Sequence, residues 1–417
     1  MSPKNKPPKT NDPYAAFRFA NYRLYTFGNF LSVMGQQMLR VAVNIEVYRQ
    51  THSMMASGLV GLFIWIPIFI FMLPGGMMAD RFNRKTLVLA CNLLFAFCAL
   101  GLAVAAHSSH PVQFIFVFLF LIGIARAFSD PPKQALLPEL VPNEHFSNAI
   151  AWNSNIFQIA TVAGPALGGL LYTWLGFTKV CGIEVLLEMI FLIFILTVRQ
   201  SAARYKSEPI SLDSLLQGLR FVWNTKLILA TITMDLFAVI LGGATALFPA
   251  FDDKVLHCGA LGVGLLQASI AAGAFTTSFL VAHLPMKKAG LSLLWAVAGF
   301  GMVTIVFGLS RWFWLSLLMM FLAGALDNIS VIVRHTLVQV LTPDSMRGRI
   351  TSVSYIFIHS SNELGGFESG AAASLLGLLP SVILGGLGSI LVVLAVIRIW
   401  PQVARLGSLQ DPLKKPI

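Results

Sequence analysis

The sequence predicts an all-α membrane protein with twelve transmembrane helices. Of its 417 residues, 56% are hydrophobic and only 11% are charged, and the mean hydropathy is +0.76. Soluble domains carry about 25% charged residues. Apolar runs of about 20 residues, the length that crosses the hydrocarbon core of a bilayer, recur along the chain. A membrane β-barrel would show short alternating segments instead, so the pattern favours helices.

These runs predict the helices one by one, in two groups of six separated by the longest polar interruption. We expect two six-helix pseudosymmetric bundles. The predicted domains are a cytoplasmic tail at 1–20, a first bundle at 21–198, a cytoplasmic linker at 199–225, a second bundle at 226–400 and a cytoplasmic tail at 401–417. The predicted helices span residues 22–48, 53–79, 86–107, 112–132, 146–173, 178–198, 226–250, 259–284, 290–309, 313–340, 347–376 and 380–400.

The two halves also repeat a loop pattern at an offset of 201 residues. The segment from Leu136 to Glu144 aligns with the segment from Leu337 to Ser345, each between the fourth and fifth helix of its half. Transporters built from such repeats bind substrate near the bilayer midplane, between the repeats. Within the linker, apolar residues recur at roughly helical spacing, which predicts an amphipathic helix on the membrane surface.

The positions of Lys and Arg predict the orientation. With the N-terminus inside, 22 of the 29 basic residues fall in cytoplasmic segments and four fall outside. Basic residues concentrate on the cytoplasmic side, so we expect a multi-pass protein of the cell inner (plasma) membrane with both termini cytoplasmic. The net charge of +11 is then an orientation signal, and no nucleic-acid partner is expected. The polar, basic first 20 residues predict a cytosolic tail and no cleavable signal peptide.

A short charged turn separates the apolar runs 59–74 and 87–106. Asp80 ends the second predicted helix, where its carboxylate can lie against the positive N-terminal end of a neighbouring helix. Gly75 and Gly76 are expected to let the second and eleventh helices approach closely. The bases of the turn have a simpler interpretation, as residues that only mark the cytoplasmic side.

This turn resembles the signature loop G-x-x-x-D-R-x-x-R-[KR] of the major facilitator superfamily. The resemblance implies that the turn holds the two halves together on the cytoplasmic side, against the helix beginning near Arg347, and stabilises an outward-open state. The implied gating residues are Gly76, Asp80, Arg81, Arg84, Lys85, Arg347, Gly348 and Arg349.

The fifth predicted helix carries a second motif. Pro165 removes a backbone hydrogen bond and bends the helix, and Gly164, Gly168 and Gly169 form a flat strip for close packing. The motif resembles the one with core G-P-x-x-G-G in exporters of the same superfamily, although Ala160 or another residue replaces the extra upstream glycine of the full motif. An ordinary kinked packing helix is the alternative. The stretches 129–142, 341–349 and 362–370 resemble the branch that holds macrolide-efflux and enterobactin-exporter proteins.

Ionisable residues within the predicted helices are costly to insert and are usually functional. A proton-coupled transporter needs a buried carboxylate that gains and loses a proton as its surroundings change. Structural ion pairing is the alternative for each, and Glu184 and Glu188 are expected to be partners of Lys179 near the outer surface. The candidates for the cavity or for proton coupling are Arg40, Glu46, Arg126, Asp130, Asp235, Asp327, Arg334, His359, Glu363 and Glu368.

We therefore expect a secondary active transporter that exports a bulky organic molecule, such as a drug, a macrolide-like compound or a siderophore, by proton antiport with alternating access. A lysophospholipid flippase or a proton-coupled nutrient importer is the alternative. The expected partners are the small-molecule substrate, protons and membrane lipid, and the chain is expected to be a monomer. No enzyme motif, metal spacing or cofactor motif is present in the sequence, and a disulfide between Cys181 and Cys258 is left open.

Overall fold

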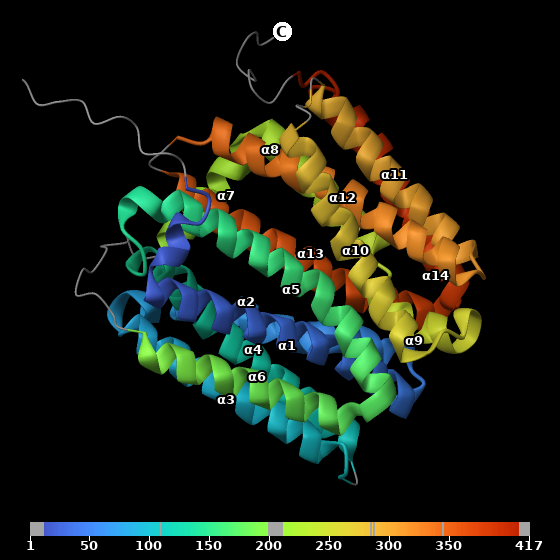
Figure 1. Cartoon of the computed structure of the whole chain (residues 1–417). Helices are drawn as coiled ribbons and strands as arrows, with labels where there is room; N and C mark the ends of the chain where they lie inside the picture. Colours follow the sequence, from blue (N-terminus) through green and yellow to red (C-terminus); the bar gives the residue numbers. More distant parts are fainter. Residues whose placement is uncertain are drawn as a thin grey trace, which may run out of the picture.

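The structure is a computed structural model that describes residues 12–108, 110–198, 212–283, 286, 288–343 and 346–407. Over these ranges the chain is almost entirely helical and has no strand. The helices form two bundles that lie side by side (Figure 1). Six membrane-crossing segments belong to each bundle, which confirms the predicted fold class.

The first bundle contains six uninterrupted helices. Ser53 caps the second of them by accepting a hydrogen bond from the Ala56 amide, and Asn83 caps the third in the same way through the Thr86 amide, each at 3.2 Å. These caps end the two sharp turns that flank the second helix. The helices are α1 (Ala20–Thr51), α2 (Met54–Arg81), α3 (Arg84–Ala105), α4 (Pro111–Leu136), α5 (Phe146–Leu175) and α6 (Phe177–Thr197).

The second bundle differs from the prediction in its first segment. A continuous helix over 226–250 was expected, but the helix ends at Gly242 and the chain continues through three short helical segments to Leu256. The pair Gly242 and Gly243, followed by Pro249, favours this break because glycine and proline both disfavour a helix interior. The helices are α8 (Lys226–Gly242), α9 (Phe248–Phe251), α10 (Gly259–His283), α11 (Ala289–Leu309), α12 (Phe313–Leu341), α13 (Arg347–Leu376) and α14 (Leu378–Ile399).

Between the bundles, α7 (Leu212–Asn224) lies within the predicted linker. Its Val222 is buried in a cluster with Ile228 of α8 and Val353 of α13, whereas Leu216 and Trp223 are exposed. The helix therefore has one apolar face against the second bundle and further apolar side chains on its surface.

Backbone conformation repeats between the halves. Gly176 joins α5 to α6 with φ of 79°, and Gly377 joins α13 to α14 with φ of 93°. These two positions differ by the same 201 residues as the repeated loop. His52 and His257, each at the end of the first segment of its half, are left-handed with φ of 47° and 48°. Matched turns at matched positions indicate two copies of one bundle design.

Two helices stand out as less apolar than the rest. By length and hydropathy, ten of the described segments can cross a membrane, and α1 and α13 are not among them. Each is nevertheless long, with 32 residues in α1 and 30 in α13. Polar side chains on these two helices face the other bundle, as described below, so their lower hydropathy reflects an interior position.

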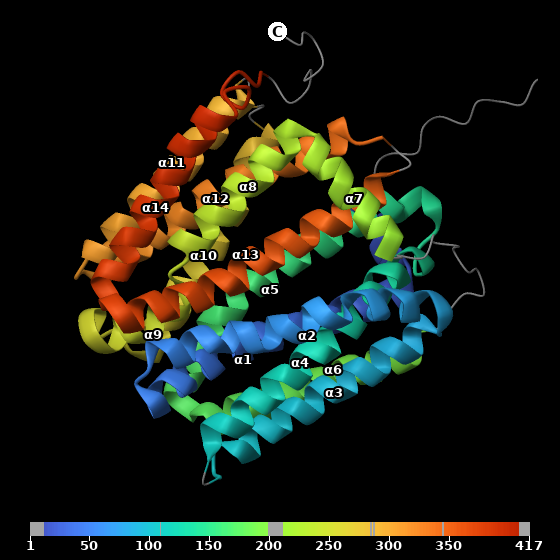
Figure 2. The ribbon, with the colours of Figure 1, turned by 180° about the vertical axis from the view of Figure 1, so that it is seen from behind.

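The bundles meet at one end of the molecule. We call the end that carries Ala20 and Ile399 the terminal end, and the opposite end, with the α1–α2 and α13–α14 junctions, the far end. At the far end, a Cβ on Gly58 of α2 would lie 2.8 Å from the Gly366 carbonyl and 3.1 Å from the Gly370 Cα. Toward the terminal end, α2 and α13 diverge (Figure 2).

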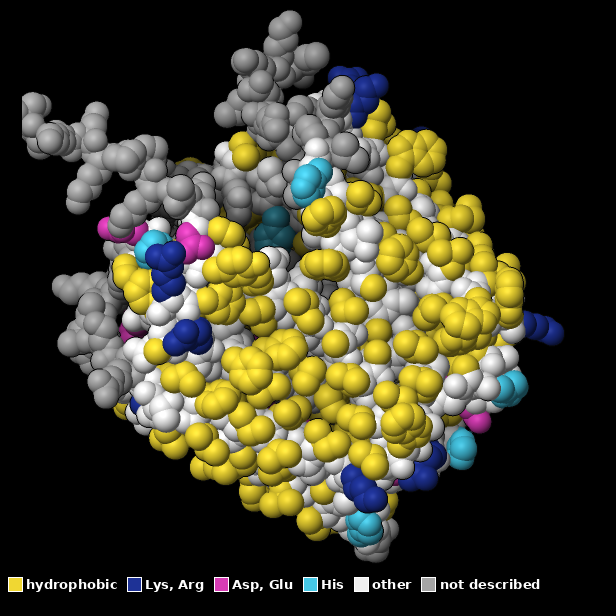
Figure 3. All heavy atoms as spheres, in the orientation of Figure 1, with side chains coloured by type: hydrophobic (Ala, Val, Ile, Leu, Met, Phe, Trp, Pro, Cys, Tyr) yellow, Lys and Arg dark blue, Asp and Glu magenta, His cyan; other side chains and the backbone are white. Residues whose placement is uncertain are grey.

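The outer surface fits a membrane environment. Figure 3 shows hydrophobic side chains over the middle of the molecule, with Lys, Arg, Asp and Glu gathered toward its two ends. Large apolar side chains such as Trp174, Trp295 and Leu391 are exposed. An exposed apolar surface of this extent needs lipid as its solvent, so the chain is a multi-pass membrane protein.

Candidate functional site

A cleft of about 280 Å³ lies between the bundles. Its walls come from α1 and α2 on one side, and from α9, α10, α13 and the turn before α9 on the other. The lining mixes apolar, amide and charged side chains, which suits a ligand with both apolar and polar parts. The polar and charged members of the lining include Gln37, Arg40, Asn44, Gln267, Asn362 and Glu363.

An ion pair crosses this cleft. Arg40 of α1 donates to the carboxylate of Glu363 of α13, and the two side chains are 40% and 12% exposed. Gly61 of α2 leaves space for this carboxylate, because a Cβ at position 61 would collide with Glu363 Oε2. The sequence analysis proposed both residues as candidates but did not predict that they form a pair. The structure brings them together from opposite bundles.

Three other candidates lie together inside the second bundle. Arg334 of α12 donates to Asp235 of α8, whose second oxygen accepts from Ser330 Oγ at 2.8 Å. The Arg334 and Asp235 side chains are only 3% and 4% exposed. Asp327 lies close enough to interact electrostatically with both. This cluster connects α8 to α12 and is not part of the cleft lining.

Glu46 is buried near the far end of the first bundle. It accepts hydrogen bonds from Arg49 at 2.8 Å, and from Gln50 and Tyr172 at 2.5 Å each. Because Tyr172 belongs to α5, this carboxylate ties α1 to α5 within one bundle. It does not line the cleft.

The remaining candidates are scattered. Arg126 of α4 lines a small cavity beside the cleft, together with Gln36 and Arg40. Asp130 on α4 and Glu368 on α13 are half-buried. The side chains of Asp80, Arg347, Arg349 and His359, and the surroundings of Gly348, lie outside the described part of the structure.

The charged turn makes its described contacts within the first bundle. Arg84 pairs with Glu139 at 2.7 Å and donates to the Ala135 carbonyl at 2.8 Å. Lys85 donates to two carbonyls at the end of α6, and Arg81 is exposed. Arg84 and Lys85 therefore hold the α2–α3 turn against the ends of α4 and α6.

The prediction that Gly75 brings the second and eleventh helices together is wrong. A Cβ at Gly75 would collide with the Ala127 carbonyl, so this glycine packs against α4 of its own bundle. The close approach of α2 to α13 depends instead on Gly58, at the far end. The sequence contains many glycines in apolar helices, and only the tertiary contacts distinguish which of them face the other bundle. Gly76 is buried.

The glycines of the α5 motif face two different helices. A Cβ on Gly164 would lie 2.6 Å from Gln37 Cβ, and one on Gly168 would lie 2.7 Å from the Met38 carbonyl, both in α1. Gly169 instead faces α10, where a Cβ would lie 3.0 Å from Gly264 Cα. Pro165 is buried between them. The motif therefore packs α5 against its own bundle and, at the far end, against the other bundle.

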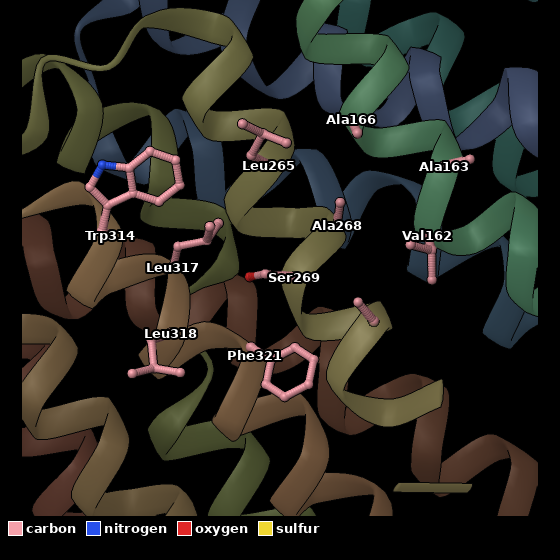
Figure 4. Close-up of a pocket in the computed structure, with 11 residues that line it drawn as sticks. Val162, Ala163, Ala166, Leu265, Ala268, Ser269, Trp314, Leu317, Leu318 and Phe321 are labelled. Carbon is pink, nitrogen blue, oxygen red and sulfur yellow. The ribbon is translucent and has the colours of Figure 1, made fainter. Parts of the chain in front are cut away.

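An apolar groove lies on the side of the molecule, between α5, α10 and α12 (Figure 4). Its volume is about 530 Å³. Ala163 and Ala166 line one wall, and Leu265 and Phe321 line the other. Among the lining side chains, polar atoms come from the Ser269 hydroxyl and the Trp314 indole. The α5 motif thus lies beside a groove at the bundle interface.

Comparison with known proteins decides the family. Residues 11–410 match a major facilitator family described as transmembrane secretion effector. The chain belongs to this family. It is therefore a membrane transporter of the major facilitator type and not an enzyme, as the sequence predicted.

Named relatives of this transporter include enterobactin exporters. The enterobactin exporter EntS of Citrobacter koseri is 26% identical over 391 residues, which cover 92% of each chain. EntS of Escherichia coli is 26% identical over 377 residues, covering 89% of this chain and 86% of the relative. The transporter is thus related to enterobactin exporters along nearly its whole length.

Solved structures show the same fold. A bacterial homologue of the human lysosomal transporter Spinster superposes with a TM-score of 0.73 at 15% identity, covering 98% of this chain and all of the other. A D-xylose–proton symporter superposes with a TM-score of 0.72 at 15% identity, covering 92% and 98%. At this level of identity the likeness concerns architecture alone.

Sequence reasoning misjudged the two acids of α6. Glu184 and Glu188 were expected to be partners of Lys179 near the outer surface, but both are buried inside the first bundle, 2% and 0% exposed. Glu188 accepts from Ser32 at 2.7 Å and from Gln36 at 2.9 Å. Ser32 and Gln36 are four residues apart and share one face of α1, and Glu184 and Glu188 are four residues apart and share one face of α6. This spacing is visible in the sequence and is the signal that could have indicated a polar contact between the two helices.

Proposed function

We propose that this transporter exports a bulky organic molecule, with a siderophore as the leading candidate, across the cell inner membrane in exchange for protons. The observation that carries the proposal is the Arg40–Glu363 ion pair, which joins the two bundles inside a cleft of mixed polarity. Relatedness to enterobactin exporters supports a siderophore within this class of substrates.

The ion pair suits an exchange mechanism because its members belong to different bundles. While Glu363 is ionised, its carboxylate accepts from Arg40 and is also available to hydrogen-bond donor groups of a substrate in the cleft. A proton on Glu363 removes the negative charge that attracts those donors. Substrate and proton therefore compete for one carboxylate, so substrate binding expels a proton and proton binding expels the substrate, as exchange requires.

Alternating access follows if the bundles rock about the cleft. In the observed arrangement the bundles contact each other at the far end and α2 and α13 diverge toward the terminal end. With both termini in the cytoplasm, as the Lys and Arg distribution favours, this arrangement is inward-facing. Substrate then enters from the cytoplasm, and separation at the far end releases it outside.

The test uses purified protein in liposomes with a pH-sensitive dye. Adding a siderophore should release protons from the wild-type protein, and a proton gradient should drive siderophore accumulation. Glu363→Gln should abolish both effects, whereas Glu144→Gln, the same change at an exposed site, should leave them intact. Wild-type protein that moves siderophore with no accompanying proton flux would refute the antiport proposal.

A lysophospholipid flippase is the second candidate, favoured by the apolar groove between α5, α10 and α12. An acyl chain fits such a groove better than a polar metabolite does, because the walls offer almost only apolar contact. Competition between lysophospholipid and siderophore distinguishes the candidates. Displacement of bound siderophore by lysophospholipid, with lipid movement in liposomes, would favour the flippase.

A further inference from the structure

The first bundle contains a pair of acids that the proposed function does not use. Glu184 and Glu188 lie on one face of α6, 2% and 0% exposed, and point at α1. Ser32 and Gln36 of α1 donate to one oxygen, Glu188 Oε1. Gly35, between them, leaves space for Glu184, since a Cβ there would collide with Glu184 Oε2.

The other side of the pair lacks donors. Within the described residues, neither Glu184 Oε2 nor Glu188 Oε2 has a hydrogen-bond partner, and neither acid has a cation within ion-pair distance. The cations that act on the pair from α4 are Arg126 and Lys133, at longer range. The Lys133 ammonium lies 5.2 Å from the centre of the Phe191 ring, which stabilises it without an acid.

Ionisation of both neighbouring carboxylates is energetically unfavourable in such an interior, because burial and mutual repulsion both disfavour the charged forms. An unpartnered buried oxygen is also unfavourable, because it has lost its hydrogen bonds to water. One added proton relieves both costs, since it removes a charge and supplies an O–H donor. We propose that Glu184 and Glu188 form a proton-binding site inside the first bundle, separate from the substrate cleft.

A small cavity lies between one neighbour of this site and one member of the ion pair in the cleft. It is lined by Gln36, which contacts Glu188, by Arg40, which contacts Glu363, and by Arg126 of α4. Its volume of about 30 Å³ exceeds the roughly 10–15 Å³ that a water molecule needs. A change of charge at the acids would therefore act on Arg40 through the Gln36 amide and a space large enough for one water molecule. As a site for the exchanged proton, the pair rests on the proposed antiport.

Infrared spectroscopy tests the site independently of any substrate. Wild-type protein in lipid nanodiscs should show a protonated-carboxyl C=O band that disappears as the pH is raised. Glu184→Gln together with Glu188→Gln should remove this band, and Glu363→Gln should leave it in place because both acids of the pair are retained. Ser32→Ala, which keeps both acids, should change the pH at which the band disappears. Identical bands in the wild type and the double variant would overturn the proposal.

Transport assays separate this inference from the proposed function. The double variant should lose proton-driven siderophore accumulation at least about tenfold, while exchange of siderophore across the membrane without a gradient continues. Full proton-driven accumulation in the double variant refutes a coupling role for the acids. A wild-type protein with the infrared band but no transport of any kind refutes the proposed function and leaves the proton site standing.

Discussion

At the scale of single residues, the structure separates two ion pairs that look alike in sequence. Arg40–Glu363 joins opposite bundles and is partly exposed in the cleft, whereas Asp235–Arg334 lies inside one bundle, almost fully buried. A pair that must break during transport needs access to water or substrate. A pair that holds two helices of one bundle does not. The first is suited to coupling and the second to stability.

Asp235→Asn should therefore destabilise the protein more than it impairs proton coupling. The change removes the carboxylate that forms the ion pair with the buried Arg334 guanidinium, and breaking a buried pair typically costs about 3–5 kcal/mol. Thermal unfolding in detergent, followed by tryptophan fluorescence, measures the loss. Combining Asp235→Asn with Arg334→Gln should recover part of the stability. A thermal midpoint unchanged from wild type would contradict the structural role.

At the scale of elements, glycines set which helices can approach. The far end closes because Gly58 of α2 lies against Gly366 and Gly370 of α13, and because Gly169 of α5 lies against Gly264 of α10. Small residues allow close backbone contact between helices in lipid, where the hydrophobic effect contributes little to association. These glycine contacts bring the helix backbones of the two bundles together at the far end.

Gly58→Ala should shift the protein toward the state that is open at the far end. The added Cβ would lie 2.8 Å from the Gly366 carbonyl, so α2 and α13 must separate to accept it. Spin labels at the far ends of α2 and α13 should report a longer distance than in the wild type. Gly182→Ala is the matched control, because a Cβ there meets nothing within 4 Å. Equal distances in the two variants would show that the contact of Gly58 with α13 does not control closure at the far end.

At the scale of the whole molecule, two similar bundles share one buried region at the far end. Val41, Ile45 and Tyr48 of α1 contribute to the same apolar cluster as Phe248 and Phe251 of the second bundle. Tyr48 also donates to Asp253 at 3.1 Å. The bundles thus meet around α1 and the broken first segment of the second half, which places the proposed pivot of the rocking motion close to the cleft.

Cys258 reports the orientation of the molecule in the membrane. It lies at the far end, between Leu256 and α10, and is partly exposed. Burial, and then the neighbouring Asp252 carboxylate, raise the pKa of the Cys258 thiol to about 12. Because the thiolate is the reactive form, labelling by a membrane-impermeant maleimide should be slow near neutral pH and accelerate as the pH rises toward the pKa.

The experiment uses a variant that keeps only this thiol. The other three cysteines are buried, and all four are free, so no disulfide joins Cys181 to Cys258. If the termini are cytoplasmic, Cys258 faces the outside. It should then be labelled in intact cells in which the reagent reaches the outer face of the inner membrane, and it should not be labelled in inside-out vesicles. The reverse pattern would invert the predicted topology and the direction of transport with it.

The sequence predicted the helices better than the partners of their charges. Long apolar runs and the Asp80 turn were enough for the membrane fold and the superfamily, because helix length and loop charge are local properties. The break after Gly242, the role of Gly58 and the burial of Glu188 escaped prediction. Each depends on which face of a helix meets which neighbour, and apolar helices with scattered polar residues leave that rotation undetermined.

By itself, the sequence determined that this chain crosses the membrane repeatedly, in two related halves, with costly charges retained inside. Only the tertiary structure decided which charges meet: Arg40 with Glu363 across the cleft, Asp235 with Arg334 within a bundle, and Glu184 beside Glu188 facing α1. The physical reason is the distance along the chain between the groups that interact. Transfer into lipid depends on each segment alone. The two ion pairs instead join residues 99 and 323 positions apart, and they form only once packing has oriented their helices.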